Sequence, residues 1–278
     1  MEYQHTIAQE TSIRGIGVHS GLEATLILKP APANHGFSFC RVDLPGDPTV
    51  KATVDAVIGT DHGTTLGLEG GEVRTIEHLL AAFTGLGIDN VIIELDGPEV
   101  PVMDGSALPF IEKIRAAGGR TLDKPRESII LSRPVHVAES GMILTALPAD
   151  EFRICCVIDY NHPLLQSQYL SLPITPDTFE KEVAPARTFG FYRDALTLME
   201  KGLIKGTSLE NTVVIGDDNI FTRGGLRFEN ECVRHKILDL IGDLSLLGRP
   251  LKALIIAIKS GHGINLQLAK KIQEVIND

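Results

Sequence analysis

Hydrophobic residues recur at helical spacing near the C-terminal end of the chain, and polar residues recur there with the same period. Over residues 228–248 this spacing predicts an amphipathic helix. Its apolar stripe comprises Val233, Ile237, Leu240, Ile241, Leu244 and Leu247. His235, Asp239 and Asp243 stand at i, i+4 and i+8, so they form a row on the opposite face. Such a row is either an ordinary solvated face or a set of side chains stacked to hold a ligand.

The rest of the chain divides into two halves with similar layouts. Each half is predicted to run through strands, a helix, another strand, a loop and a last helix. Aligning TIEHLLAAFTGLGIDNVIIEL with VRHKILDLIGDLSLLGRPLKALIIAI places His78 opposite His235, which indicates an internal duplication. The other predicted helices are residues 75–83, 107–117 and 264–276, and the strand-like runs are 22–28, 90–95, 128–137, 142–147, 152–160 and 251–258.

The stretch GGRTLDKPRES, residues 118–128, is the best candidate for a boundary between the halves, because glycine, proline and alternating charge interrupt both periods. We therefore predict a first α+β domain over residues 1–122 and a second over 128–278. Strand groups followed by helices favour an α+β fold over an alternating βαβ fold, here with two similar halves packed face to face. Residues 186–217 have no visible counterpart in the first half and are interpreted as an insert.

Composition narrows the classes of protein. No apolar run approaches the roughly 18 residues of a membrane span, and the N-terminus MEYQHTIAQE does not resemble a signal peptide, so a cytoplasmic location is expected. The four cysteines form no CxxC pair and are expected to be reduced. The net charge of −10 argues against nucleic-acid partners and anionic membranes. A monomer is favoured, and peripheral contact with a membrane is left open, although no amphipathic anchor is visible.

Two polar groups on these helices have metal-site spacing. His235 and Asp239 form an HxxxD pair whose side chains can reach one ion from one side of a helix. Glu77 and His78 point away from the apolar face of their own helix. Each group also has an ordinary explanation: a solvated i, i+4 pair, and a first-turn glutamate behind a Thr75 cap.

The duplication changes that balance. It places His78 and His235 on equivalent helices, so that with Asp239 they would form a three-ligand set with one coordination position open, as a catalytic zinc site requires. Glu77, beside a ligand, would lie close enough to accept a proton from water.

A proton donor is suggested by the loop SGHGIN. His262 lies there just before a predicted helix, whose N-terminus disfavours an imidazolium. A donor in that place would need a carboxylate to hold its charge, and Asp243 is the obvious candidate. The ordinary alternatives are a loop histidine and a solvated carboxylate.

Other polar residues carry weaker signals. Lys236, Arg187, Arg193 and Lys259 could supply local positive charge for phosphates, although most lysines and arginines are simply on the surface. His19 is interpreted as a turn residue. The remaining histidines, which include His62, have no partner pattern.

Six stretches, taken together, resemble one family. They occur in that family's order and cover nearly the whole chain: RGIGVHSG at 14–21, TIEHLLAAFTGLGIDN at 75–90, VPVMDGSALPF at 100–110, PARTFGF at 185–191, HKILDLIGDLSLLG at 235–248 and GHGINLQL at 261–268. On these motifs the chain resembles the UDP-3-O-acyl-N-acetylglucosamine deacetylases, the zinc amidases of bacterial lipid A biosynthesis.

The resemblance implies a fold and a set of roles. The family's fold has two similar α+β halves, each with a small insert, and a cleft between them. One catalytic Zn²⁺ is implied, with Fe²⁺ as the alternative ion. The implied roles are metal ligation by His78, His235 and Asp239, general base catalysis by Glu77, general acid catalysis by His262 with Asp243, oxyanion stabilisation by Thr188, contact with the sugar nucleotide by Lys236 and Asp194, and lining of the acyl passage by Phe189 and Phe191.

The implied reaction is hydrolysis of the N-acetyl group of UDP-3-O-acyl-N-acetylglucosamine, which gives acetate and a free amine, in the cytoplasm of a Gram-negative-type bacterium. It is the committed step of lipid A biosynthesis. Two other hypotheses are weighed against it. A metal-dependent phosphoesterase would need a second metal and more carboxylate ligands. A non-enzymatic binding module would not depend on a metal at all.

Overall fold

The N-terminal half is built on a five-stranded sheet. The computed structural model describes residues 2–277, and in it the strand order of this sheet is β2-β3-β9-β4-β5. β3 and β9 are antiparallel, whereas β4 and β9 are parallel. The strands are β2 (Thr11–Ile16), β3 (Glu23–Pro30), β4 (Phe37–Arg41), β5 (Thr49–Lys51) and β9 (Val91–Leu95).

The C-terminal half repeats this topology. Its strand order is β12-β13-β19-β14-β15, with the same alternation of antiparallel and parallel pairs, and β11 (Ile129–Ile130) adds parallel to β19. The predicted strand over 128–137 is interrupted, because Pro134 has no N–H for a strand ladder. The remaining strands are β12 (Val135–Glu139), β13 (Met142–Pro148), β14 (Arg153–Ile158), β15 (Gln168–Pro173) and β19 (Leu251–Ile258). The prediction of an α+β fold with two similar halves is confirmed.

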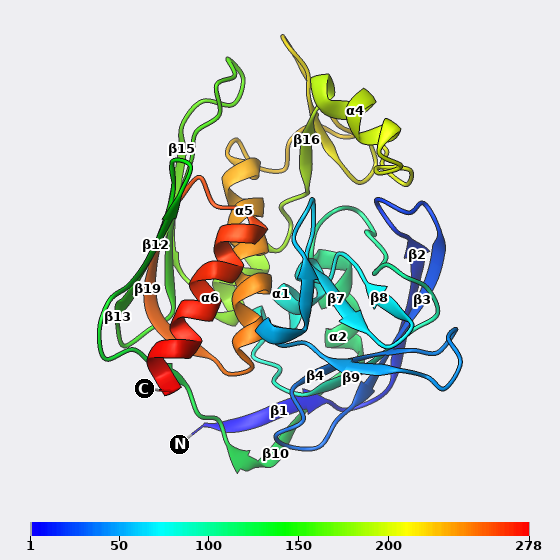
Figure 1. The fold of residues 1–278 in the computed structure, drawn as a ribbon, viewed down its shortest axis with the longest axis vertical. Coiled ribbons are helices and arrows are strands. Elements are labelled where there is room, and N and C mark those ends of the chain that lie inside the picture. Colours follow the sequence, from blue (N-terminus) through cyan, green and yellow to red (C-terminus); the bar gives the residue numbers. More distant parts are fainter. Residues whose placement is uncertain (1, 278) are drawn as a thin grey trace.

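The long helices of both halves lie between the two main sheets (Figure 1). The long ones are α1 (Glu77–Gly85), α2 (Leu108–Ala117), α5 (Glu231–Leu244), which η4 (Ser245–Leu247) extends, and α6 (His262–Asn277). α1 packs directly on α5, and a Cβ atom at Gly242 of α5 would overlap the backbone carbonyl of Glu77. The polar row of α5 therefore faces the other half of the protein.

Each half carries a small three-stranded sheet at the same point of its topology, between the fifth strand of the main sheet and the central helix. In the first half these strands are β6 (Val57–Gly59), β7 (Thr65–Leu68) and β8 (Gly71–Val73), after η1 (Val54–Ala56). In the second half they are β16 (Phe189–Phe191), β17 (Val213–Ile215) and β18 (Ile220–Phe221), with α3 (Pro176–Thr178), η2 (Phe179–Val183), η3 (Tyr192–Asp194) and α4 (Ala195–Glu200). The interpretation that residues 186–217 have no counterpart was wrong. Strands of two to four residues leave little periodicity to detect in the sequence.

The stretch expected to separate the halves is largely a strand. β10 (Gly119–Pro125) pairs antiparallel with β1 (Tyr3–Ile7), and a boundary at residue 122 falls inside it. The division into domains at 122 and 128 stays a prediction. Among residues 2–277, no helix has both the length and the apolar character needed to cross a membrane.

Candidate metal and catalytic site

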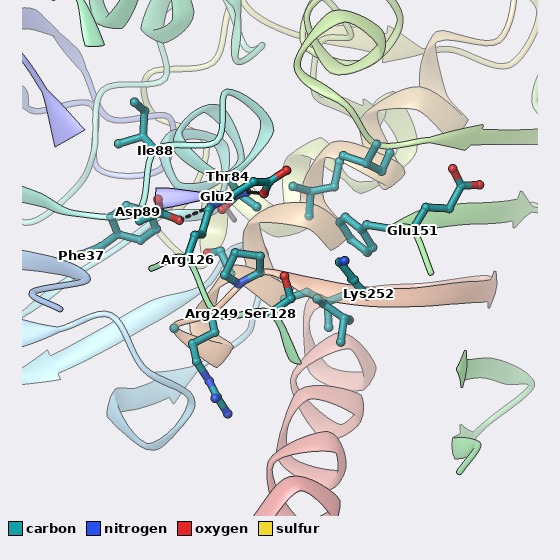
Figure 2. A pocket seen from close by; sticks show the side chains of 18 residues that line it. Glu2, Phe37, Thr84, Ile88, Asp89, Arg126, Ser128, Glu151, Arg249 and Lys252 are labelled. Carbon is teal, nitrogen blue, oxygen red and sulfur yellow. Dashed lines mark hydrogen bonds and ion pairs between the residues drawn. The ribbon is translucent and has the colours of Figure 1, made fainter. Parts of the chain in front are cut away.

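One cavity of 760 Å³ collects the residues predicted for the site. Every one of them except Asp243, which is buried behind His262, lines its wall: Glu77, His78, Thr188, Phe189, Phe191, Asp194, His235, Lys236, Asp239 and His262. Figure 2 shows a separate cavity of 190 Å³, lined among others by Phe37, Thr84 and Arg126, which contains none of them. The chemistry of the candidate site therefore belongs to the larger cavity.

The chain enters α1 through a sharp turn. Thr75 has a φ of 57°, and its hydroxyl donates to the Glu99 carboxylate (3.0 Å) instead of accepting from a backbone N–H of the first helical turn. The interpretation of Thr75 as the N-cap was wrong, because α1 begins at Glu77 after this left-handed residue. Glu77 and His78 are both buried, at the contact between α1 and α5.

His78, His235 and Asp239 form a compact cluster. One potential ligand atom from each lies within 4.8 Å of the others. The Nε2 atoms of His78 and His235 are 3.6 Å and 3.3 Å from Asp239 Oδ1, and the two rings meet edge to face. All three side chains are buried, so the cluster is not a solvated face.

Neighbouring groups orient the cluster for metal binding. His235 donates its Nδ1–H to the Ala186 carbonyl (3.1 Å), which leaves Nε2 available as a ligand. Burial lowers the pKa of His235 to about 4, so its imidazole is neutral. Lys236 donates to Asp239 Oδ2 (2.6 Å), which leaves Oδ1 beside the histidines.

The charge states of Asp239 and Lys236 also suit metal binding by the Asp239 carboxylate. Burial opposes ionisation of Asp239, but His235 and Lys236 hold the pKa of that carboxyl well below its usual range. Burial likewise opposes the charge of Lys236, and Asp239 raises the pKa of that ammonium. Two imidazoles and one carboxylate fit a catalytic zinc site, and the same donor set also suits Fe²⁺. The residues thus define a site for a transition metal without choosing the ion.

Glu77 lies beside the cluster with one oxygen fixed. The backbone N–H of Thr64 donates to Oε2 (2.9 Å), while Oε1 is 3.9 Å from His262 Nε2. Burial raises the pKa of Glu77. A carboxylate whose proton affinity is raised is better suited to accept a proton near neutral pH.

His262 begins α6 and is held by Asp243. Its Nδ1–H donates to Asp243 Oδ2 (2.9 Å), which also accepts from the Asn265 amide (2.8 Å). Burial disfavours its charge, but Asp243 and then Glu77 raise the pKa of His262 to about 9. The effect of the Asp243 carboxylate on the pKa of His262 is therefore larger than the opposing effect of the helix N-terminus. The imidazolium form of His262 dominates at neutral pH.

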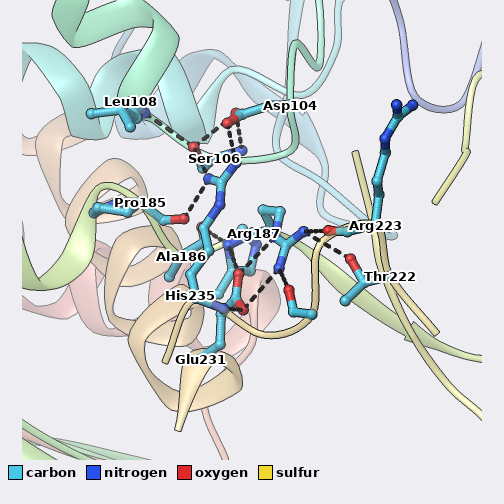
Figure 3. A network of polar contacts seen from close by, with 12 residues as sticks. Asp104, Ser106, Leu108, Pro185, Ala186, Arg187, Thr222, Arg223, Glu231 and His235 are labelled. Atoms are coloured by element: carbon cyan, nitrogen blue, oxygen red, sulfur yellow. Dashed lines mark hydrogen bonds and ion pairs between the residues drawn. The ribbon is translucent and has the colours of Figure 1, made fainter. Parts of the chain in front are cut away.

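Thr188 is positioned by a buried ion pair. The preceding residue, Arg187, donates to Glu231 (2.9 Å), to the Thr222 hydroxyl and to the carbonyls of Arg223 and Gly225 (Figure 3). Thr188 itself donates its N–H to the Gly105 carbonyl (2.8 Å). Arg187 is therefore a structural anchor rather than a phosphate ligand, and the suggestion that it binds phosphate was wrong.

The other three basic candidates differ in their surroundings. Only Lys236 lines the cavity. Arg193 stacks over the Phe191 ring (4.9 Å to the centroid) and lies 4.0 Å from Asp194. Lys259 pairs with Asp159 (2.9 Å) outside the cavity wall.

Aromatic rings form one side of the cavity. Phe189 and Phe191 lie 5.9 Å and 5.3 Å from Tyr160, measured between ring centroids, and Phe189 also meets the ring of His235 edge-on (6.3 Å). His162 lies 5.5 Å from Phe191. Sequence reasoning missed Tyr160 and His162, because neither carries a spacing signal.

A second group missed from the sequence is centred on Glu99. Buried Glu99 accepts from the backbone N–H groups of His19 (2.9 Å) and Ser20 (2.7 Å). His19, treated above as a turn residue, donates Nε2–H to the His62 carbonyl (2.9 Å), and both histidines line the cavity. Residues some 80 positions apart (His19 and Glu99) give no local pattern from which this contact could be predicted.

A duplicated α+β fold that places a two-histidine, one-aspartate cluster beside a buried glutamate and a histidine–aspartate pair defines a metal-dependent hydrolase. Over residues 4–274 the chain matches the family described as UDP-3-O-acyl N-acetylglycosamine deacetylase, and it belongs to that family. The resemblance drawn from the six motifs is confirmed.

Curated relatives agree along nearly their whole length. The UDP-3-O-acyl-N-acetylglucosamine deacetylase of Myxococcus xanthus (strain DK1622) is 46% identical over 269 residues, which are 97% of this chain and 86% of that protein. The protein of the same name from Leptospira biflexa serovar Patoc (strain Patoc 1 / Ames) is 44% identical over 275 residues, 99% of this chain and 91% of that protein. That from Syntrophus aciditrophicus (strain SB) is 40% identical over 274 residues, 99% of this chain and 87% of that protein.

Proposed function

We propose that this protein is a zinc-dependent deacetylase that hydrolyses the N-acetyl group of UDP-3-O-acyl-N-acetylglucosamine. The products are acetate and UDP-3-O-acyl-glucosamine, and the step belongs to lipid A biosynthesis. Membership of the family and the names of its relatives support the substrate. The observation that carries the proposal is that the metal cluster, Glu77 and His262 line one cavity.

The metal site would supply the nucleophile. A zinc ion held by His78, His235 and Asp239 would lower the pKa of water at its open position toward ~7. Glu77 would accept the proton of the attacking water at Oε1, because Oε2 is already held by the Thr64 N–H. Its raised pKa favours this transfer.

The leaving amine needs a proton, because an amide anion is a very poor leaving group. His262 supplies it from Nε2, since Nδ1 is engaged with Asp243. With a pKa of about 9, His262 carries that proton throughout the neutral range. Acid and base thus act from adjacent walls, with Glu77 Oε1 and His262 Nε2 3.9 Å apart.

The remaining predicted residues bind the substrate and stabilise the transition state. The Thr188 hydroxyl donates to the oxyanion that develops on the acetamide carbonyl. Lys236 and Asp194 contact the sugar nucleotide, and Phe189 and Phe191 line the path of the acyl chain. Burial of that chain contributes ~0.8 kcal/mol per methylene, so chain length is a basis for specificity.

We place the reaction in the cytoplasm. The enzyme acts there as a monomer, and its substrate is one acylated UDP-sugar. The four cysteines are free in the structure, which suits a reducing compartment. Zinc is the proposed ion, with Fe²⁺ as the alternative that the donor set also accommodates.

Metal analysis combined with an acetate-release assay on the acylated UDP-sugar tests the proposal. We expect one metal per chain, acetate release, and loss of activity with a chelator. Two metals per chain with phosphate release would indicate a phosphoesterase instead. An unaltered binding function after chelation would indicate a non-enzymatic module.

A further inference from the structure

Thr64 contacts both sides of the proposed catalytic machinery. It lies between β6 and β7 in the insert of the first half, is 1% exposed, and belongs to none of the motifs identified in the sequence. Its N–H donates to Glu77 Oε2 (2.9 Å), and its hydroxyl donates to Asp243 Oδ1 (2.6 Å) on α5 of the other half. Its carbonyl accepts from the N–H of Ile76 (3.4 Å), just before α1.

From these contacts we infer that Thr64 is a positioning residue that sets the orientation of both catalytic carboxylates. The inference rests on the proposed deacetylase function. Among the described residues, Thr64 belongs neither to the metal cluster nor to the cavity lining. It acts through the groups that it contacts, which are Glu77, Asp243 and, with its hydroxyl 3.5 Å from Nδ1, His262.

On Asp243, Thr64 completes the hydrogen bonding of a buried charge. Oδ2 accepts from His262 and Asn265, and Oδ1 accepts from the Thr64 hydroxyl. With both oxygens engaged, the carboxylate cannot rotate freely. His262 is thereby kept in the form that carries its proton on Nδ1 toward Asp243 and presents Nε2 to the cavity.

On Glu77, the backbone of Thr64 selects the reactive oxygen. Because Oε2 accepts the Thr64 N–H, Oε1 is the oxygen that faces His262 Nε2. One residue therefore fixes the base through its backbone and the partner of the acid through its side chain. The two functions can be separated, because a side-chain substitution leaves the N–H in place.

The loop that carries Thr64 is itself fixed from outside. His62 has a φ of 60°, and its carbonyl accepts the Nε2–H of His19 (2.9 Å). Glu99 in turn holds the backbone of His19. Support of this kind holds a catalytic constellation in one geometry before substrate binds.

The test compares Thr64→Val, which keeps shape and the N–H but removes the hydroxyl, with Thr64→Ser, which keeps the hydroxyl. We expect Thr64→Val to lower kcat about 10- to 100-fold, the equivalent of one hydrogen bond to a charged group, with little change in KM. Thr64→Ser should remain within about 3-fold of the parent. Thr65→Val is the matched control, because this neighbouring residue begins β7 and is not among the residues that line the cavity, and it should leave kcat unchanged.

A double-mutant cycle separates positioning from general destabilisation. If Thr64 acts through Asp243, the Thr64→Val change should cost less than about 3-fold once Asp243 is already alanine. A full 10- to 100-fold loss in that background, or an equal loss in Thr64→Ser, would overturn the inference.

A readout without substrate distinguishes this inference from the proposed function. In protein labelled with ¹⁵N-histidine, the Nδ1 proton of His262 should give a hydrogen-bonded signal in the parent and in Thr64→Ser. In Thr64→Val it should shift or broaden. An identical spectrum in Thr64→Val refutes the role of Thr64 whatever the substrate, whereas the expected spectra without acetate release would refute the deacetylase proposal alone.

Discussion

Replacing Asp243 by asparagine tests how the protein keeps His262 protonated. Asp243 is the main group that raises the pKa of His262 from 6.5 to about 9 against the effect of burial. That rise in pKa corresponds to about 3 kcal/mol in favour of the imidazolium. Without the charge of Asp243, Glu77 and Asp239 alone oppose the effect of burial, so we expect the pKa of His262 to fall from about 9 toward 6.5.

The sign of the change follows from the role of His262 as an acid. Activity requires the protonated form, so the alkaline limb of kcat/KM marks the pKa of His262 in the free enzyme. At pH 8 the protonated fraction falls from roughly nine-tenths to roughly three-hundredths when the pKa moves from 9 to 6.5, a loss of about 30-fold. Near pH 6 the loss should be much smaller.

The assay is acetate release over pH 5–10 for the parent and Asp243→Asn. Asp159→Asn is the control, because Asp159 is a half-exposed carboxylate paired with Lys259 outside the cavity. A bound metal cation opposes the charge of His262, so it moves the alkaline limb to lower pH in both the parent and Asp243→Asn. It does not reverse the difference between the two enzymes. An alkaline limb that stays in place in Asp243→Asn would refute the reasoning.

The other predictions concern the base, the metal, the buried ion pair and the acyl path. Glu77→Gln should lower kcat at least 100-fold while metal analysis still finds the ion bound, and a lost metal would contradict its role as base. His78→Ala should abolish stoichiometric metal binding, as equilibrium dialysis would measure. Arg187→Met should lower the free energy of unfolding by about 3–5 kcal/mol in urea, because it leaves the fully buried Glu231 carboxylate unpaired; a change below 1 kcal/mol would contradict the anchoring role. Phe191→Ala should raise KM for long acyl chains more than for short ones, and an equal effect on both would exclude Phe191 from the acyl path.

Hydrophobic periodicity was sufficient to predict an element from the sequence wherever that element is long and amphipathic. The spacing over 228–248 predicted α5 to within a few residues at each end, and its polar row became informative only when the duplication set His78 opposite His235. A single helix could not distinguish a solvated row from a buried one. The distinction depends on a second helix, and only an internal repeat makes that partner visible in one sequence.

The parts that could not be predicted depend on contacts distant in sequence. Thr64 reaches Asp243 across 179 positions, and Glu99 reaches His19 across 80. Arg187 was misjudged because residue type indicates charge but not burial. The small sheets escaped detection because strands of two to four residues contain at most two full periods of alternation.

The close approach of α1 and α5 at Gly242 has a thermodynamic consequence. Because His78 comes from one half and His235 and Asp239 from the other, an ion can be held by all three only while the two helices remain in contact. By mass action, a bound ion therefore stabilises the contact between the two halves. Its contribution to the free energy of unfolding is about 4 kcal/mol when the concentration of free ion exceeds the dissociation constant a thousandfold. Chelation should therefore lower the melting temperature of the protein as well as its catalytic rate. Replacing Gly242 by any other residue should separate α1 from α5 and thereby weaken the affinity of the cluster for the ion, although residue 242 is not itself a ligand.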